Sequence, residues 1–481
     1  MDNEIDQEKT GRKKRGRKRY VLITYVFFGL FVLLLARLLY FTGIESEDFI
    51  NSSYNPRLSK LSETVERGNI KTSDGTVVAE TVKNDNGTEE RNYPFGPMYA
   101  HSVGYAVNGS LGAEKDFNFQ MMRSHIFFVK RIYLELSGQK LPGDNLVLTL
   151  DSRLQKKAYY GMGDYDGAVI AIEPDTGKVL CMVSKPDFDP NTIKEDWEAI
   201  VSDSSSSVLL NRATQGLYPP GSVAKIVTAL EMIDEGKADT FTYDCEGEEE
   251  RGDYTIHCYR STAHGNEDFA ASFANSCNVA FGNMGLMIDK NRFDLLSERL
   301  LFNRNLPTSL PNVAKSSISM AECDSEALIM QTAIGQGKTL VTPLHMAMLS
   351  SAVANDGIVK EPYISDYIEN ADGGVVRTYR GKTYGSIMSR EEAERMKALM
   401  RLVITDGTGQ GLLTDDYTAY GKTGTAEYTD DKQKTHSWFT GFAEKDGKKI
   451  VVAVIMEGAG TSSAHAVPLT KSLFDTYFQN E

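Results

Sequence analysis

The 481-residue sequence contains little cysteine and little histidine. Its five cysteines are too few to build a disulfide-based scaffold. Cys245 and Cys258 lie in a stretch that predicts a β-hairpin, so one disulfide and two buried free thiols are both compatible with the sequence. The seven histidines are scattered and form no cluster with the cysteines at metal-ligand spacing. We therefore predict neither a metal site nor a cofactor.

Positive charge is sparse in most of the chain. Of its 52 lysines and arginines and 66 acidic residues, nine and four respectively lie in residues 1–41. The remainder therefore carries 43 basic and 62 acidic side chains, a net charge of −19. An acidic body of this size argues against nucleic acid or anionic lipid as its partner.

A long apolar run occurs near the N-terminus. Residues 20–41 are apolar apart from Thr24, a few tyrosines and Arg37, and they follow a basic run over residues 9–19. The apolar run is long enough to cross a bilayer, and basic residues beside such a run stay on the cytoplasmic side. No small-x-small cleavage site follows, and no cysteine precedes Cys181 to carry a lipid. We predict an uncleaved, single-pass signal anchor over 20–41, a cytoplasmic tail over 1–19, and the rest of the chain outside the cell membrane.

The chain after the anchor divides into a short and a long part. Residues 42–145 begin with a polar stretch over 42–60 and continue with strand–turn–strand patterns such as the one around Asp74-Gly75. They predict a small β-rich module, here called the pedestal. Residues 146–481 predict one α+β domain in which a sheet joins early and late strands, and they show no internal repeat. The strands predicted for this domain cover 145–150, 167–172, 178–184, 419–428, 437–443 and 450–456, and the helices cover 153–160, 222–234, 272–288, 343–354, 390–404 and 468–478.

The segment Tyr218-Pro-Pro-Gly-Ser222-Val-Ala-Lys225 places a serine at the start of a predicted helix. The prolines and glycine prevent a helix before Ser222, and the free N–H groups at a helix start favour negative charge. Lys225 lies one turn further on the same helix face. A partly desolvated lysine can lose its charge and take the proton of such a serine. The pattern alone is weak, because the chain also contains Ser137-Gly-Gln-Lys140 with no helix behind it.

Two later motifs strengthen the case. Ser276-Cys277-Asn278 begins an apolar helical stretch, and Lys422-Thr423-Gly424-Thr425 lies in a predicted strand. S-x-x-K, a Ser-x-Asn element and K-T-G occur together in penicillin-binding proteins and β-lactamases. A phosphate loop is excluded, because the glycine it requires is replaced by Asp416 before the K-T-G motif. Cys277 is predicted to be a packing residue.

With these motifs, the chain resembles the class B penicillin-binding proteins, the monofunctional D,D-transpeptidases that cross-link peptidoglycan. The resemblance implies a transpeptidase domain of the penicillin-binding and serine β-lactamase fold, an antiparallel sheet with helices, preceded by a β-rich pedestal and one transmembrane helix. It extends to segments outside the three motifs, namely Arg67-Gly68, residues 101–105, 112–115, 334–337, 341–344 and 436–442.

The resemblance also implies a role for each motif residue. Ser222 attacks the D-Ala–D-Ala amide and forms an acyl-enzyme, Lys225 accepts its proton, and Ser276 relays a proton to the leaving D-alanine. Lys422 lowers nearby pKa values through its charge. The backbone N–H groups of Ser222 and Thr425 form the oxyanion hole. The substrate-binding residues implied by the family are Asn278, Thr423, Gly424 and Thr425.

Three alternatives stay open at this point. A D,D-carboxypeptidase differs only in using water as the acceptor. A β-lactamase or β-lactam sensor of the same fold would need a base for deacylation, and Glu298-Arg-Leu-Leu-Phe302 does not complete the Glu-x-x-Leu-Asn pattern of one β-lactamase class. A non-catalytic envelope scaffold is disfavoured because all the motif residues are present.

The partners implied by the resemblance are peptidoglycan stem peptides, β-lactams as inhibitors, and a membrane glycosyltransferase of the SEDS type. The pedestal contains too few residues for a glycosyltransferase domain of its own. We expect a SEDS-type partner to contact the anchor and the pedestal.

Overall fold

The computed structural model describes residues 2–41, 56–107, 110–204, 206–252, 254–427 and 435–479, with side chains for residues 20–41 and from residue 60 onward. The chain forms two compact units, Met1–Lys60 and Leu61–Glu481. Most of the polar stretch predicted over residues 42–60 lies outside the described residues, as does Tyr428 at the end of the predicted strand 419–428.

The first unit contains the helix α1 (Asp2–Tyr40). Its portion Tyr20–Tyr40, 21 residues long, is long and apolar enough to cross a membrane. At 1.5 Å per residue it spans about 31 Å, close to the thickness of a bilayer's hydrocarbon core. The predicted anchor therefore coincides with a suitable helix, while its orientation stays a prediction.

The second unit is built on a five-stranded antiparallel sheet with the order β17-β18-β19-β7-β8. Strand β19 pairs with β7, with Val454 opposite Val169, so the late part of the chain closes onto the early part. This confirms the predicted sheet that joins early and late strands. The strands are β7 (Gly167–Glu173), β8 (Lys178–Lys185), β17 (Thr418–Glu427), β18 (Thr435–Lys445) and β19 (Lys448–Met456).

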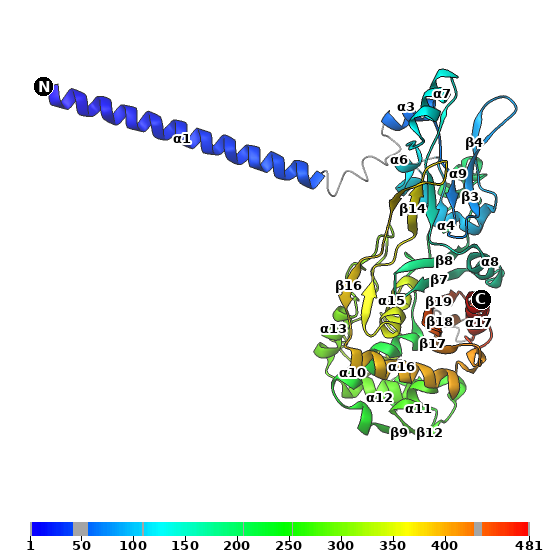
Figure 1. Cartoon of the computed structure of the whole chain (residues 1–481). Coiled ribbons are helices and arrows are strands. Elements are labelled where there is room, and N and C mark those ends of the chain that lie inside the picture. Colours follow the sequence, from blue (N-terminus) through cyan, green and yellow to red (C-terminus); the bar gives the residue numbers. More distant parts are fainter. Residues whose placement is uncertain are drawn as a thin grey trace. The chain divides into compact units, whose positions relative to one another are not determined.

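Helices cover both faces of this sheet, which is why β18 and β19 are buried over nearly their whole length. Ser437 Oγ accepts a hydrogen bond from the N–H of Ala466 in α17, whereas Thr440 Oγ1 donates to Met346 O in α15. Residues three apart on a strand point to opposite faces, so α15 and α17 lie on opposite sides of the sheet, as Figure 1 shows. The helices are α8 (Ser152–Gly161) and α17 (Ala466–Phe478) on one face and α15 (Pro343–Ala354) on the other.

A lobe made mostly of helices packs beside the edge strand β17, which its helix α16 contacts. Its helix α16 begins at the predicted capping box, in which Ser389 and Glu392 exchange hydrogen bonds. Figure 1 shows the lobe's helices together with β9 and β12 at the end of the unit opposite the pedestal. The elements are α10 (Lys225–Asp234), α11 (Phe269–Ala274), α12 (Asn278–Met287), α13 (Lys290–Arg299), α14 (Glu326–Ala333), α16 (Arg390–Thr405), β9 (Thr242–Cys245), β10 (Glu248–Arg251), β11 (Tyr254–His257) and β12 (Gly265–Asp268).

The pedestal contributes strands to a six-stranded sheet with the order β15-β14-β6-β2-β3-β4. Two of its strands, β14 and β15, come from much later in the chain, and the domain boundary at residue 145 stays a prediction. The strands are β2 (Ile70–Lys71), β3 (Val77–Lys83), β4 (Glu89–Asn92), β6 (Asn145–Leu148), β14 (Ser365–Glu369) and β15 (Val375–Thr378), and the helices are α3 (Pro56–Thr64), α4 (Ala100–Val103), α5 (Gly112–Asp116), α6 (Asn118–Met121) and α7 (Phe128–Leu136).

A buried ion cluster holds the pedestal together. Glu114 is fully buried and accepts hydrogen bonds from Arg67 Nε and Arg91 Nε, each at 2.7 Å. Arg67 precedes β2, Arg91 lies in β4 and Glu114 lies in α5. The cluster therefore joins three segments that are distant in the sequence.

Candidate active site

Ser222 lies in a short 3₁₀ turn, η3 (Gly221–Ala224), directly before α10. The prediction of an α-helix from Ser222 onward is therefore wrong by one turn, since the α-helix begins at Lys225. Gly221 has a φ of 53°, and its N–H donates to Gly335 O at 2.9 Å. This hydrogen bond ties the turn to the segment 334–337, which the family resemblance also includes. Ser222 itself is partly exposed.

Lys225 is fully buried, and its ammonium nitrogen donates to three acceptors. These are Ser276 O at 2.6 Å, Ser276 Oγ at 3.3 Å and Asn278 Oδ1 at 2.7 Å. Among the described residues no carboxylate forms an ion pair with it. Burial lowers the pKa of Lys225 to about 8, because the charged form loses its hydration and the smaller opposing effects of Cys277, Cys258 and Glu267 do not make up for that loss.

Ser276 occupies a break between two helices. Its φ of 57° is rare for a residue other than glycine and ends the helical path between α11 and α12. The predicted continuous helix over 272–288 is therefore wrong, because residues 275–277 form a turn. The turn points the carbonyl and hydroxyl of Ser276 at Lys225, and Asn278 then starts α12. Cys277 caps α12, with its sulfur accepting from the N–H of Ala280.

The K-T-G motif lies on the edge strand β17, which packs against the turn that carries Ser222. A Cβ placed on Gly424 would lie 2.9 Å from Val223 Cγ1 and 3.0 Å from Pro220 O, so only glycine fits. A Cβ placed on Gly221 would lie 2.8 Å from Thr425 O. The structure therefore brings Ser222 and Thr425 side by side, as the motifs predict for one site.

Lys422 is the second fully buried lysine of the site. Its nitrogen donates to Thr423 O at 3.2 Å and lies 5.5 Å from the ring centre of Phe273. Burial, and then the charge of Lys225, lower the pKa of Lys422 well below its ordinary value. The site thus combines two buried lysines with the partly exposed Ser222, and the charge of Lys225 opposes that of Lys422.

Some residues of the site were missed by the sequence analysis. Phe281 lies under Lys225, with 5.2 Å from the nitrogen to the ring centre, and could have been found as the residue one turn after Asn278 on the same helix face. His257 O accepts from Asn278 Nδ2 at 2.8 Å, and no sequence signal points to this backbone contact. The hydroxyl of Thr408, in the loop after α16, shares a hydrogen bond with the hydroxyl of Thr423.

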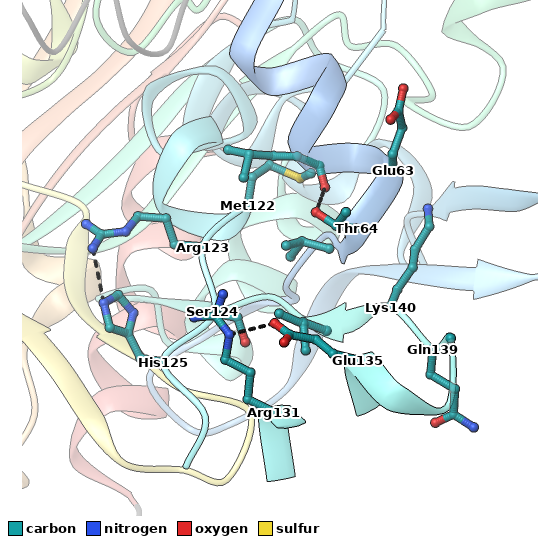
Figure 2. A pocket seen from close by; sticks show the side chains of 14 residues that line it. Glu63, Thr64, Met122, Arg123, Ser124, His125, Arg131, Glu135, Gln139 and Lys140 are labelled. Atoms are coloured by element: carbon teal, nitrogen blue, oxygen red, sulfur yellow. Dashed lines mark hydrogen bonds and ion pairs between the residues drawn. The ribbon is translucent and has the colours of Figure 1, made fainter. Parts of the chain in front are cut away.

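A separate hollow of about 760 Å³ lies in the pedestal, away from these residues. Figure 2 shows that Arg123 points toward His125 and Arg131 toward Glu135, so these cations already have protein partners. The hollow is lined by mixed polar and apolar side chains of α3, α7 and the segment between α6 and α7. It contains no serine–lysine pair like that of the catalytic motifs.

Two domain families match the chain. The penicillin binding protein transpeptidase domain matches residues 167–475, and the penicillin binding protein A dimerisation domain matches residues 67–146. The first covers well over half of the sequence. The chain belongs to the penicillin-binding proteins with a transpeptidase domain, and the predicted class B family and fold are confirmed.

Relatives and solved structures agree with this assignment. The chain is 29% identical over 439 residues to the peptidoglycan D,D-transpeptidase PbpA of Mycolicibacterium smegmatis, covering 85% of this chain and 88% of that protein. It is similar to the D,D-transpeptidase domain of a peptidoglycan glycosyltransferase from Eggerthella lenta, with 28% identity, a TM-score of 0.76 and coverage of 87% and 99%. It is also similar to the imipenem acyl-enzyme complex of penicillin-binding protein A from M. tuberculosis, with 25% identity, a TM-score of 0.77 and coverage of 86% and 99%.

Proposed function

We propose that this protein is a peptidoglycan D,D-transpeptidase that cross-links stem peptides through an acyl-serine intermediate and is inhibited by β-lactams. The observation that carries the proposal is the environment of Lys225. It is buried, has no carboxylate partner among the described residues, and is held by Ser276 and Asn278 one helical turn from Ser222.

The reaction divides among the motif residues. Lys225 in its neutral form accepts the proton of Ser222, whose oxygen attacks the carbonyl carbon of the D-Ala–D-Ala amide. Ser276, which shares a hydrogen bond with Lys225, passes a proton to the leaving amine. Lys422 keeps the local environment positive when it is charged. Asn278 accepts from Lys225 with Oδ1 and donates one N–H of Nδ2 to His257 O, so its second N–H binds the carbonyl of a substrate amide.

The strand β17 supplies the remaining groups. The carbonyl of Thr425 faces Gly221. In a β-strand the N–H and C=O of one residue point to the same side, so the N–H of Thr425 also points toward the turn of Ser222. There it forms the oxyanion hole together with the N–H of Ser222. Thr423 and Thr425 bind the terminal carboxylate of the substrate. Gly424 allows the strand to approach the turn of Ser222 closely enough for this contact.

Intact-mass analysis with benzylpenicillin tests the proposal. We expect one stable adduct on the wild-type chain and none on Ser222→Ala. Ser137→Ala is the matched control, since Ser137 belongs to the second S-x-x-K sequence but is exposed on a loop, and it should acquire the adduct like the wild type. An adduct that is hydrolysed rapidly would indicate a β-lactamase, and a folded protein without an adduct would indicate a scaffold.

An acyl-acceptor assay separates the transpeptidase from the carboxypeptidase. A stem peptide ending in D-Ala–D-Ala is incubated with a second peptide that offers an amine. The proposal predicts a cross-linked product. Release of D-alanine with hydrolysed peptide alone would favour a carboxypeptidase.

We further infer that the chain is anchored by α1 with the catalytic unit on the outer face of the cell membrane. The basic run over residues 9–19 supports this orientation, because basic residues beside a first apolar helix stay in the cytoplasm. A fused reporter that is active only outside the cytoplasm should be active at the C-terminus and inactive at the N-terminus. The reverse pattern would contradict the inference.

We also propose that a SEDS-type membrane glycosyltransferase contacts the anchor and the pedestal. The pedestal helix α7 supports a contact there, because its apolar stripe is exposed and no residue of the helix is buried. The exposed side chains of this stripe are Phe128, Val129, Ile132, Tyr133 and Leu136.

Co-purification tests this contact. Ile132→Asp combined with Leu136→Asp should reduce recovery of the polymerase, and a variant with an exchanged anchor should reduce it as well. Leu295→Asp is the control, since the exposure of Leu295 lies between those of Ile132 and Leu136 but this residue lies on α13 in the helical lobe. Full recovery with both the α7 variant and the exchanged anchor would show that the partner binds elsewhere.

A further inference from the structure

Three cysteines and one histidine converge beside the active site. The sulfur of Cys258 lies 3.6 Å from those of both Cys245 and Cys277, and Cys245 Sγ lies 3.6 Å from His264 Nδ1. The four atoms all lie within 4.8 Å of one another. The prediction that the histidines are scattered and form no cluster with the cysteines is wrong for His264. The cluster lies within residues 245–277, but Cys258 is 13 residues from Cys245 and 19 from Cys277, intervals longer than the short ligand spacing typical of zinc sites.

The three separations of 3.6 Å fit a tetrahedral metal site better than a disulfide. Zn²⁺ binds thiolate sulfur at about 2.3 Å and imidazole nitrogen at about 2.0–2.1 Å, which places two sulfurs about 3.8 Å apart and a sulfur and a nitrogen about 3.6 Å apart. A disulfide requires about 2.05 Å between the sulfurs. Three thiolates and one imidazole are a donor set that Zn²⁺ uses in closed structural sites.

The segment that carries three of these side chains has little core of its own. Residues 242–268, here called the β9–β12 lobe, form two hairpin-like pairs, β9 with β12 and β10 with β11. Among its described residues the only apolar side chains that are fully buried are Cys245, Ile256 and Cys258. So small and acidic a segment buries too little apolar surface to be held by packing alone, and small segments of this kind are commonly held by a metal.

We propose that Cys245, Cys258, His264 and Cys277 bind one Zn²⁺ ion, which fastens the β9–β12 lobe to the start of α12 and thereby positions the Ser276–Asn278 segment. The cysteines bind as thiolates and release their protons on binding. No electron is transferred and no co-reactant is needed.

The ligands lie directly against the groups that hold Lys225. Cys277 stands between Ser276 and Asn278, both of which accept hydrogen bonds from Lys225. Asn278 also donates to His257 O, and His257 precedes Cys258. A metal bound to Cys277 holds the backbone directly before Asn278. Bound to Cys258 as well, it holds the neighbouring His257, whose carbonyl accepts from the Asn278 side chain. Cys277 is thus a positioning residue as well as the packing residue expected from the sequence.

Metal analysis of the full chain tests the site. The protein is purified in detergent without chelator, incubated with Zn²⁺ and freed of excess ion, and its zinc content and intact mass are measured. We expect about one zinc per chain, and thiolate-to-metal absorption when Co²⁺ replaces Zn²⁺. A disulfide among the three cysteines, or free thiols without retained zinc, would overturn the proposal.

Variants locate the site. Cys258→Ser and His264→Ala should each weaken zinc binding by at least about 100-fold, which is more than the loss of an outer partner costs. Cys323→Ser is the matched control, because Cys323 is also buried but lies outside the cluster, and its zinc content should equal that of the wild type. His264 is only half-buried, so its variant keeps the test valid if Cys258→Ser fails to fold. Equal zinc in all variants would place the metal elsewhere.

The positioning role has its own readout. Removal of zinc should slow the covalent step of benzylpenicillin acylation by up to about 100-fold and leave the preceding non-covalent binding nearly unchanged, and added Zn²⁺ should restore the rate. An unchanged covalent step after full removal would overturn the positioning role. Because zinc content is measured without reference to acylation, failure of the metal site and failure of the proposed enzyme activity are distinguishable.

Discussion

The pedestal and the catalytic domain both bury charged side chains, but they surround them differently. In the pedestal, burial opposes the charge of Glu114, yet Arg67 and Arg91 outweigh this effect and the pKa of Glu114 is lowered. In the catalytic domain, Lys225 and Lys422 are equally buried, and no carboxylate pairs with either of them among the described residues. Their pKa values are therefore lowered toward the neutral form.

The difference separates a structural charge from a reactive one. A buried carboxylate with two guanidinium partners stays charged and joins distant segments of the chain. A buried amine that contacts only neutral acceptors can lose its proton near physiological pH and act as a base. Burial opposes the charged form in both regions, but the partners differ, so Glu114 stabilises the pedestal while Lys225 can act as a base.

The largest effect is expected from removing the reactive amine. Lys225→Met should slow acylation by benzylpenicillin by about 10³- to 10⁴-fold, the upper range for loss of a general base. Stopped-flow or intact-mass kinetics measure the rate. Lys140→Met, in the second S-x-x-K sequence, is the control and should acylate at the wild-type rate. A Lys225→Met enzyme that keeps a tenth of the wild-type rate would remove Lys225 from the role of base.

Removing one structural charge should affect stability instead. Arg91→Met leaves Glu114 buried with a single partner, and the free energy of unfolding should fall by about 3–5 kcal/mol, as for other broken buried pairs. Urea denaturation measures this, and acylation at low temperature should stay close to wild type. A loss below about 1 kcal/mol would mean that the cluster is not a structural centre.

The smallest effect is expected for an exposed pair in the same region. Arg131 and Glu135 lie one turn apart on α7, and each side chain is more than half exposed. Arg131→Ala should lower the free energy of unfolding by no more than about 0.5 kcal/mol in the same denaturation experiment. A loss as large as that of Arg91→Met would show that burial does not distinguish the two pairs.

Much of this organisation could be predicted from the sequence. The motifs of Ser222, Ser276 and Lys422 identify the family, and local signals such as the capping box at Ser389 identify individual helices. The break at Ser276 could not be predicted, because a left-handed backbone is rare for serine and no glycine or proline marks the break in the local sequence. The two arginines around Glu114 could not be predicted either, since they lie 47 and 23 residues from it and only the fold brings them together. The cysteines around His264 lie within one stretch of the chain, but their separations of 13 and 19 residues do not match the short ligand spacing of common zinc motifs.

The most direct test of a buried, unpaired lysine as the base is the pH dependence of acylation. Because only the neutral amine accepts the proton of Ser222, the rate of the covalent step should rise about tenfold per pH unit at low pH and level off above a midpoint near 8, the value to which burial lowers the pKa of Lys225. Benzylpenicillin acylation of the wild-type chain, followed over a range of pH in which the protein stays folded, gives this midpoint. A rate that does not change through this range, or one that still rises at the ordinary pKa of lysine, would contradict the account.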